Sequence, residues 1–341
     1  PLLLPREDAL PVTMHDVAER AGVSVRTVSR VVNKSEELSD ATRQRVLLAI
    51  KELGYRPSKL ARALVTQRTE TIGLLIPDIT NPFFSEVAQG VGVAAEEQGY
   101  SLLLANTDLD ADKEVKALWN LADHAVDGAI LFGSPGSERA LQEFASEYAP
   151  VVAINNYRLA SAHPCIGCIR TSLVEGAELA VNHLANRGHR AIAMLSDVYE
   201  PSLLARVRGY REALEARGLP VRDDWIARGR PVIDHGYRAT LRLLKAYPEI
   251  TGIFAYNDLL AVGAIQACKE LRRRIPDTCA IVGFDNIRLA ALISPSLTTI
   301  HIDKYRLGRE AFDRLLEMLD CPETTPVTVQ MPVSLVVRES A

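Results

Sequence analysis

The sequence predicts an all-α helix-turn-helix head followed by an α/β body with two doubly wound parallel-sheet lobes. Three observations lead to this fold class. Two short helix patterns meet at a tight turn between Val12 and Asn33. From Glu70 onward, short buried strand patterns alternate with amphipathic helix patterns. A similar series begins at His189, so we expect the body to contain two related lobes.

The first helix of the head is expected to begin at Met14. Thr13 is a suitable N-cap, and Asp16 three residues later completes a capping box, in which side chains satisfy backbone N–H groups without helical partners. Ala18 is small enough for a second helix to cross closely. Gly22 can adopt the positive φ that a short turn between two helices often requires.

The second helix is expected to follow Ser24 as its cap, with Val28 and Val31 facing inward. The polar and cationic outer face is formed by Val25, Arg26, Ser29, Arg30 and Asn33. A helix with such a face fits the DNA major groove, where arginine pairs with guanine and asparagine with adenine. The alternative is a helical hairpin with a solvated charged face. The spacing of Ala, Gly and Val within one capped unit favours DNA binding.

A third helix is predicted from Ser39 or Asp40 to Leu53, with Gly54 ending it. Val46, Ile50 and Leu53 form its apolar stripe. The segment 12–68 carries eleven Lys and Arg against six Asp and Glu, a net charge of +5, whereas 69–341 carries 27 against 35, a net of −8. A basic head next to an acidic body is typical of a protein whose head binds phosphates.

Residues 57–68 contain good helix formers but are too few for a stable isolated helix. We expect this hinge to fold when DNA is bound, with paired copies in a dimer burying Ala61 and inserting Leu64 into the minor groove. A plain linker is the alternative. The expected domains are a flexible leader 1–11, a helix-turn-helix domain 12–57, a hinge 58–69 and a core 70–341. The core divides into an N-lobe of about 70–168 and 301–325 and a C-lobe of about 169–300 and 326–341.

Length and composition suit a soluble three-unit protein, since 341 residues exceed one ordinary core and hydrophobic residues make up 48%. No apolar run is long enough to cross a bilayer, and PLLLP at the start lacks the features of a signal peptide. Five cysteines without a framework pattern suggest reduced thiols. We therefore expect a cytoplasmic protein without membrane association.

Polar and aromatic side chains follow the predicted strands of both lobes. In open parallel sheets, ligands bind beyond the carboxyl ends of the strands. Carboxylates and amides that bond hydroxyls, with phenyl rings that stack on a sugar face, suit a small polar ligand. For each residue alone, helix capping or turn formation is the alternative. The strand-end set is Asp78, Asn81, Phe83, Phe84, Asn155, Asn257, Asp258 and Asp285, and Arg206 adds a cationic donor.

The chain resembles the lactose/galactose repressor family from about Val12 to Arg338. The motifs that carry the resemblance are VTMHDVAERAGVSVRTVSRVVN, SDATRQRV, ELGYRPS, LARAL, IGLLIPDITNPFF, GHRAIAML, ARVRGYREAL, NDLLAVGAI, VGFDN and LTTIHID. The resemblance implies a homodimeric transcription regulator, in the usual case a repressor, that binds a pseudo-palindromic operator. It also implies a core similar to periplasmic sugar-binding proteins, with a small effector between its lobes.

Several residues can be assigned through this resemblance. Val25, Arg26 and Arg30 match base-reading positions, and Leu64 matches the intercalating hinge leucine. Arg206, Asn257 and Asp285 match the main polar effector contacts, and Ser172 a less constant one. The expected DNA-binding set is Thr13, Ser24, Val25, Arg26, Thr27, Ser29, Arg30, Asn33, Tyr55, Ala61 and Leu64.

The sequence also departs from the family pattern. Ser58 replaces the asparagine that often opens the hinge helix, and Ser172 stands where many members have aspartate. Pro231 lies near a position that often supplies an aromatic lid. The final VVRESA lacks the leucine-rich tail that makes some relatives tetramers.

Other motifs were considered and are not favoured. Gly90 to Ala95 fits G-x-G-x-x-A but lies inside a predicted helix, where it could not cradle pyrophosphate. Cys165 and Cys168, near His163, form a lone C-x-x-C without a second ligand pair. We expect no metal, no cofactor and no catalysis. A sugar is the expected effector; a nucleoside or nucleobase, a partner protein, a solute-binding transport module and an enzyme with a DNA-binding head are the alternatives.

Overall fold

The computed structural model describes residues 12–32, 38–55, 68–132, 137–155, 164–197, 202–321 and 328–341. The chain divides into two compact units, Pro1–Thr69 and Glu70–Ala341. This division coincides with the predicted boundary between hinge and core.

The head contains three helices, α1 (Met14–Ala21), α2 (Val25–Val32) and α3 (Asp40–Leu53). The predicted capping box is present on α1, and Ser39 caps α3. Gly22 and Gly54 follow α1 and α3 with φ of 63° and 64°, a left-handed conformation that glycine adopts at little cost. The predicted starts of the three helices and the predicted end of α3 are confirmed.

The core of the head is small and, apart from Tyr55, its buried side chains are aliphatic. Val17 and Ala18 of α1 pack with Val28 and Val31 of α2, as the helical spacing predicted. The predicted apolar stripe of α3 packs in this core. Val46 is buried, but Ile50 and Leu53 are partly buried, and the fully buried second position is Ala49. A small side chain lies there because α3 packs against both other helices.

Each lobe of Glu70–Ala341 has a six-stranded sheet among its described residues, with the same strand order in both lobes. Neighbouring strands are parallel except for the last pair of the second sheet, β10 and β12. The doubly wound parallel sheets and the internal repeat are therefore confirmed. In order across the N-lobe sheet, the strands are β2 (Ser101–Asn106), β1 (Thr71–Ile76), β3 (Gly128–Leu131), β4 (Val151–Ile154), β5 (Ile166–Thr171) and β11 (Thr328–Met331). The C-lobe order is β7 (Ile226–Gly229), β6 (Ile192–Asp197), β8 (Gly252–Ala255), β9 (Ala280–Asp285), β10 (Thr298–His301) and β12 (Ser334–Val336).

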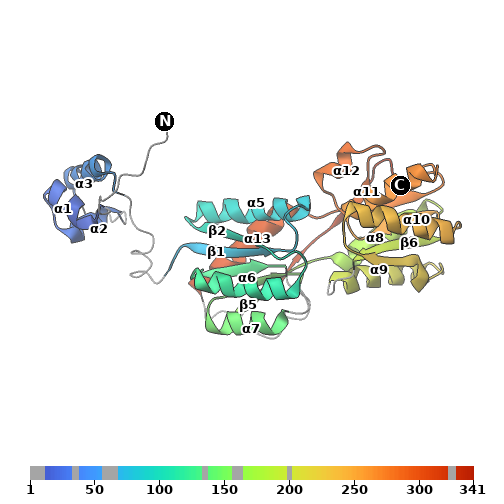
Figure 1. Cartoon of the computed structure of the whole chain (residues 1–341), viewed down its shortest axis with the longest axis horizontal. Helices are drawn as coiled ribbons and strands as arrows, with labels where there is room; N and C mark the ends of the chain where they lie inside the picture. Colours follow the sequence, from blue (N-terminus) through green and yellow to red (C-terminus); the bar gives the residue numbers. More distant parts are fainter. Residues whose placement is uncertain are drawn as a thin grey trace. The chain divides into compact units, whose positions relative to one another are not determined.

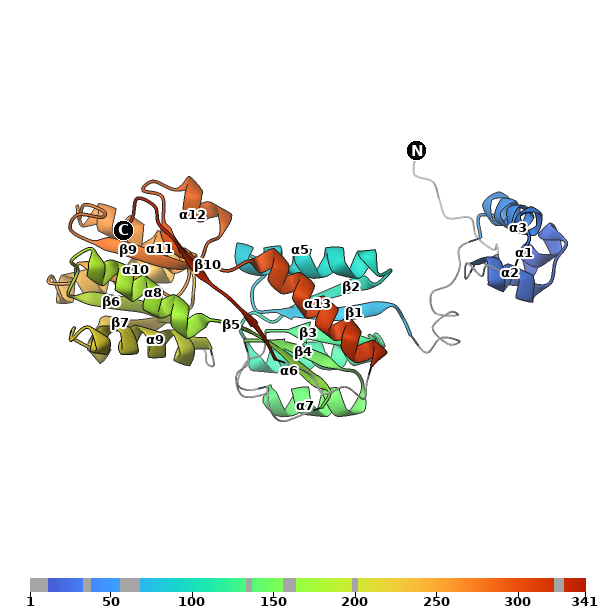
Figure 2. The same ribbon diagram turned by 180° about the vertical axis from the view of Figure 1, so that it is seen from behind.

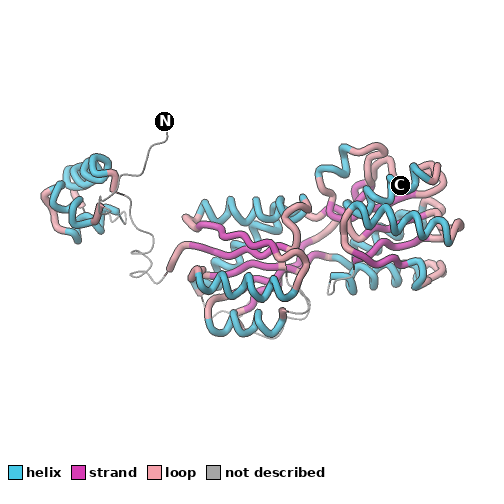
Figure 3. Tube along the Cα trace, in the orientation of Figure 1, coloured by secondary structure: helices cyan, strands magenta, loops and turns pink. Residues whose placement is uncertain are grey.

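Helices cover both faces of each sheet (Figures 1 and 3). Alternate residues of one strand enter different cores: Leu74 packs toward α5 and α13, whereas Leu75 packs toward α6 and α7. The C-lobe is built in the same way. The N-lobe helices are α5 (Pro82–Glu97), α6 (Ala111–Asp123), α7 (Glu138–Glu147) and α13 (Lys304–Asp320). The C-lobe helices are α8 (Leu173–Asn186), α9 (Ser202–Ala216), α10 (Ile233–Ala246), α11 (Asp258–Glu270) and α12 (Arg288–Leu292), with the short 3-10 helix η1 (Asp223–Trp225).

The chain passes between the lobes three times in the described residues, after β5, after β10 and after β11 (Figure 2). This moves the predicted lobe boundaries. The whole of β5 to Thr171 belongs to the N-lobe, β10 to His301 belongs to the C-lobe, and β11 pairs with β5 of the N-lobe. Only the segment after β11 returns to the C-lobe, where β12 pairs with β10.

Candidate functional site

The outer face of α2 is built as the sequence predicted. The Oγ of Ser24 accepts a hydrogen bond from the backbone N–H of Thr27 at 3.1 Å and so caps the helix. Val28 and Val31 are buried, whereas Val25 and Arg26 are exposed, with 42% of Val25 accessible to solvent. Ser29 and Arg30 are half-buried on the same helix. An exposed helix face with two arginines is the geometry that enters a major groove.

Two other residues of the predicted DNA-binding set have structural roles. The Oγ1 of Thr13 accepts a hydrogen bond from the N–H of Asp16, and the Asp16 carboxylate accepts one from the N–H of Thr13 at 2.7 Å. The hydrogen bonds that the N–H and the hydroxyl of Thr13 donate to the Asp16 carboxylate lower its pKa. Tyr55 is buried in the core of the head, and burial raises the pKa of its phenol. Asn33, Ala61 and Leu64 lie outside the described residues, as do Ser58 and most of the predicted hinge.

The N-lobe contributes an aromatic group at the carboxyl end of its sheet. Asn81 caps α5 by accepting the N–H of Phe83 at 3.0 Å, so the capping alternative holds for its Oδ1. Phe83 is buried and Phe84 half-buried, with ring centroids 5.1 Å apart. Phe132, which follows β3, lies 5.0 Å from Phe84. All three contacts between these rings are edge-to-face.

Phe132 is missing from the residues selected from the sequence. Its signal was available, because it follows β3 directly, as Asn155 follows β4. A phenylalanine at the end of a buried strand, however, is difficult to distinguish from an ordinary core residue by pattern alone.

The remaining N-lobe candidates lie at strand ends with partners of their own. Asp78 accepts hydrogen bonds from the N–H and hydroxyl of Thr80. Asn155 accepts the N–H of Thr171 at 2.8 Å and therefore joins the ends of β4 and β5. The hydroxyl of Ser172, where β5 leaves the N-lobe, accepts a hydrogen bond from the side chain of Gln330 at 2.9 Å.

Among the C-lobe candidates, Arg206 is a buried cation with several close neighbours. It is 5% exposed, and its guanidinium carbon lies 4.1 Å from the centroid of Tyr256 and 4.3 Å from that of Phe284. One terminal nitrogen lies 3.7 Å from the Asp285 carboxylate. Its Nε has no hydrogen-bond partner among the described residues. A buried cation is thus held in place by two rings and one carboxylate, with a donor still to be satisfied.

Asp285 is buried at the end of β9, and its titration is strongly altered. Burial raises its pKa to about 7, although the nearby charges of Arg206 and Lys304 act in the opposite direction. Burial of a carboxylate disfavours its charged form, so a cationic neighbour is needed to keep it ionised near neutral pH. Asp285 is therefore a stronger hydrogen-bond acceptor when its cationic neighbours keep its carboxylate ionised.

Two neighbouring candidates, Asn257 and Asp258, are both buried and both hydrogen-bonded within the C-lobe. Asn257 caps α11 by accepting the N–H of Leu260 and donates its amide to the carbonyl of Pro231 at 3.1 Å. Asp258 is fully buried, and its two oxygens accept the Thr299 hydroxyl at 2.5 Å and the N–H of Ile287 at 2.8 Å. Burial raises the pKa of Asp258 well above its ordinary value. We therefore assign Asp258 a structural role inside the C-lobe and leave it out of the effector set.

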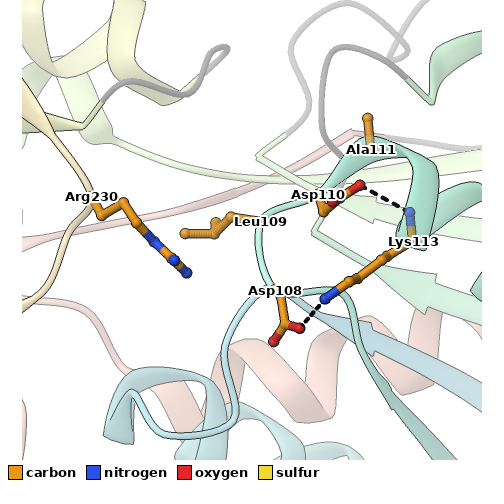
Figure 4. A pocket seen from close by; sticks show the side chains of 6 residues that line it. All are labelled: Asp108, Leu109, Asp110, Ala111, Lys113 and Arg230. Atoms are coloured by element: carbon orange, nitrogen blue, oxygen red, sulfur yellow. Dashed lines mark hydrogen bonds and ion pairs between the residues drawn. The ribbon is translucent and has the colours of Figure 1, made fainter.

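An open groove of about 680 Å³ lies at the carboxyl ends of the edge strands β2 and β7 (Figure 4). Asp108, Leu109, Asp110, Ala111 and Lys113 line it from the N-lobe, and Arg230 lines it from the C-lobe. Lys113 forms an ion pair with Asp108 on the N-lobe side. None of these residues was selected from the sequence, because the turn after β2 has no motif. Pro231, next to Arg230, has no aromatic ring and so could not act as the aromatic lid.

Comparison with known proteins decides the family. The lacI model of bacterial regulatory proteins matches residues 13–58, and a model of a periplasmic binding protein-like domain matches 181–341. Catabolite control protein A of Priestia megaterium is 35% identical over 331 residues, covering 96% of this chain and 99% of that protein. The chain belongs to the lacI family of bacterial regulatory proteins. The transcriptional repressor PurR of Mannheimia succiniciproducens is 36% identical over 332 residues, covering 96% and 98% of the two chains.

Solved structures of lacI-family regulators have the same fold. The lac repressor dimer bound to operator and the anti-inducer ONPF is similar with a TM-score of 0.85 at 27% identity, covering 97% of this chain and 99% of that one. The CelR–cellobiose complex is similar with a TM-score of 0.73 at 30% identity, covering 97% and 100%. A family regulator from Enterococcus faecium with bound ribose has a TM-score of 0.70 at 30% identity, covering 80% and 98%.

As a lacI-family protein, the chain is a ligand-responsive transcriptional repressor with a helix-turn-helix head and a periplasmic-binding-protein-like core. Within the described ranges, no group of three His, Cys, Asp or Glu side chains could hold a metal. Within the same ranges, no helix is long and apolar enough to cross a membrane.

Proposed function

We propose that this lacI-family repressor is a homodimer that binds a pseudo-palindromic operator and that its effector is a sugar, bound between the two core lobes. The observation that carries the sugar assignment is Arg206, buried between Tyr256 and Phe284 beside Asp285, with an Nε that has no hydrogen-bond partner among the described residues. Cationic and carboxylate groups fixed next to each other can donate to and accept from adjacent hydroxyls of one ring.

The N-lobe residues of the proposed set add the aromatic surface that a sugar ring needs. Phe84 is half-buried next to Phe83 and Phe132. A sugar ring has C–H groups on its faces and hydroxyls on its edge, so a phenyl ring opposite a set of polar groups suits it. The proposed effector set is Asp78, Asn81, Phe83, Phe84, Asn155, Ser172, Arg206, Asn257 and Asp285. Two relatives at 30% identity were solved with cellobiose and with ribose, which supports the same class of ligand.

The dimer and its operator are proposed on the same basis. The lac repressor similar to this chain was solved as a dimer on its operator. A two-fold symmetric protein reads a pseudo-palindromic site, because each head meets the same half-site. Ala61 and Leu64 keep their proposed roles at the hinge, with Leu64 entering the minor groove.

The three passages between the lobes provide the means of regulation. A ligand that contacts both lobes favours one relative orientation, and the N-lobe is joined directly to the segment that leads to the head. We propose that this orientation sets the spacing of the paired hinges. Effector and operator then influence each other reciprocally, typically by about 1–3 kcal/mol.

A thermal-shift screen tests the effector class. The full chain is heated with cellobiose, ribose, sorbitol and adenosine, and we expect stabilisation by a sugar. Arg206→Ala should abolish this shift. Arg208→Ala is the matched control, because Arg208 lies two residues along the same helix, is 64% exposed and pairs only with Glu212 among the described contacts. Stabilisation by adenosine alone would replace the sugar with a nucleoside.

Selection of DNA from a palindromic duplex library tests the operator. We expect enriched two-fold sites and a complex with two protein chains per duplex. Failure to retain any duplex would favour a solute-binding transport module over a regulator. Conversion of the bound ligand into a new product, followed by NMR, would indicate an enzyme instead.

A further inference from the structure

Lys304 is a buried cation at one of the passages between the lobes. It is the first residue of α13, three residues after β10 ends, and is only 3% exposed. A buried ammonium group is costly unless it is paired and hydrogen-bonded. Its partners therefore show what the position is built to hold.

Those partners come from both lobes. The Nζ of Lys304 donates to the carbonyl oxygens of Asp285 at 2.8 Å and Asn286 at 2.9 Å, in the turn after β9 of the C-lobe. A third, longer bond reaches the carbonyl of Ile302 at 3.4 Å. The same nitrogen lies 3.5 Å from the carboxylate of Glu86 on the N-lobe helix α5.

The turn that Lys304 holds has an unfavourable backbone conformation. Asp285 has a φ of 103° and Asn286 a φ of 50°, values that residues with a side chain rarely adopt. Such a conformation persists only when surrounding contacts fix it. Two carbonyl groups of this turn are fixed by one ammonium group, and the side chain of Asp285 extends from the same turn to Arg206.

We propose that Lys304 is a positioning residue of the effector site, which holds the Asp285 carboxylate against Arg206 and connects that turn to Glu86 on the helix that carries Phe83 and Phe84. One side chain thereby links the turn of the C-lobe that carries Asp285 to the helix of the N-lobe that carries Phe83 and Phe84. The role of Asp285 as an effector contact rests on the proposed function, but its dependence on Lys304 does not.

The charges around Asp285 give this link a measurable signature. Arg206 on α9 and Lys304 on α13 lower its pKa and Glu86 on α5 raises it, while the charge of Asp285 adds to burial in raising the pKa of Asp258 on α11. Burial lowers the pKa of His301, the last residue of β10, and the charge of Lys304 acts in the same direction. Removing the charge of Lys304 should therefore raise the pKa of Asp285, whereas removing the charge of Glu86 should lower it.

Carboxyl ¹³C NMR of the full chain, labelled at the aspartate Cγ, measures this without any ligand. The Asp285 resonance is assigned by its loss in Asp285→Asn. In Lys304→Met we expect its titration to move to higher pH, and in Lys304→Arg to stay close to that of the wild type. In Glu86→Gln it should move to lower pH. Lys269→Met is the control, because Lys269 is an exposed C-lobe lysine that donates to the carbonyl of Ser294.

The sign of the shift separates positioning from a loss of structure. A loosened lobe would admit water to Asp285 and lower its pKa toward the ordinary value. An unchanged or lower titration in Lys304→Met overturns the proposal. If Lys304→Met does not fold, Glu86→Gln decides, and an unchanged Asp285 titration there overturns it equally. Absence of any sugar shift in the wild type would remove the proposed effector and leave the NMR result standing.

Discussion

The carbonyl oxygen of Tyr305 on α13 occupies the space that a Cβ atom at Gly90 on α5 would need. Gly308 lies in the same position toward the carbonyl of Val87, so the two helices approach each other through a pair of glycines. Gly90 belongs to the G-x-G-x-x-A motif, and this contact supports helix packing over nucleotide binding as the reason for its small residues.

Gly90→Ala should therefore destabilise the core. Overpacking a tight contact costs about 1–3 kcal/mol, which exceeds the gain of roughly 1 kcal/mol that alanine brings to a helix interior. Gly92→Ala on the same helix is the control, since its Cβ would lie 3.7 Å from Leu102, an ordinary contact. Urea unfolding should show a lower midpoint for Gly90→Ala and an equal or higher one for Gly92→Ala. Equal midpoints in both variants would contradict this account of the contact.

Asp258→Ala should destabilise the C-lobe without any direct role in ligand binding. The substitution leaves the N–H of Ile287 and the hydroxyl of Thr299 without their buried acceptor, at a cost of about 1–3 kcal/mol for each unsatisfied group. Asp234→Ala is the control, because Asp234 is 64% exposed and pairs with Arg238 on the surface. Such exposed pairs contribute about 0–1 kcal/mol. Thermal unfolding should separate the two variants, and similar midpoints would return Asp258 to the candidate ligand contacts.

The helices of the head and the individual strands of the lobes were largely predictable because their signals are local. Thr13, Gly22 and Gly54 mark helix ends within a few residues, and buried runs such as TIGLLI mark strands. The lobe boundaries were not predictable to the residue. Whether β11 joins the N-lobe depends on its pairing with β5, more than 150 residues earlier in the sequence, and no local pattern specifies that choice.

The candidate site also contains some residues that the sequence could identify and others that it could not. Asn257 and Asp285 follow strands, so the rule for open parallel sheets selects them, and the family motifs add Arg206. Tyr256 and Lys304 could not be selected in this way. Tyr256 reads as the end of a buried strand until Arg206 is found above its ring. Lys304 reads as an ordinary helix residue until the carbonyls of the Asp285 turn are found around it.

The stability of the core should fall as the pH rises toward neutrality, in part through Asp285. The folded pKa of about 7 lies above the ordinary 3.8, so the folded protein retains a proton that the unfolded chain has released. The contribution of this group is complete below the unfolded pKa and is lost as the pH rises through the folded one. Thermal midpoints across this window should therefore decline more in the wild type than in Asp285→Asn. Parallel declines in the two proteins would contradict the raised pKa.

Arg26 and Arg30 should determine operator affinity and sequence preference more than other arginines of the head do. An arginine that pairs with a base contributes about 1–3 kcal/mol of discrimination, and every lost phosphate contact reduces the salt dependence of binding. Arg20→Ala is the control, because Arg20 lies at the end of α1 and is compensated by Glu52 at 2.6 Å. Fluorescence anisotropy on a selected operator and on a variant with one changed base pair measures both the affinity and the sequence discrimination. Arg26→Ala or Arg30→Ala should reduce the difference between the two duplexes, whereas Arg20→Ala should preserve it. If both substitutions on α2 weakened binding to the two duplexes equally, α2 would contact the backbone of the DNA and another element would read its sequence.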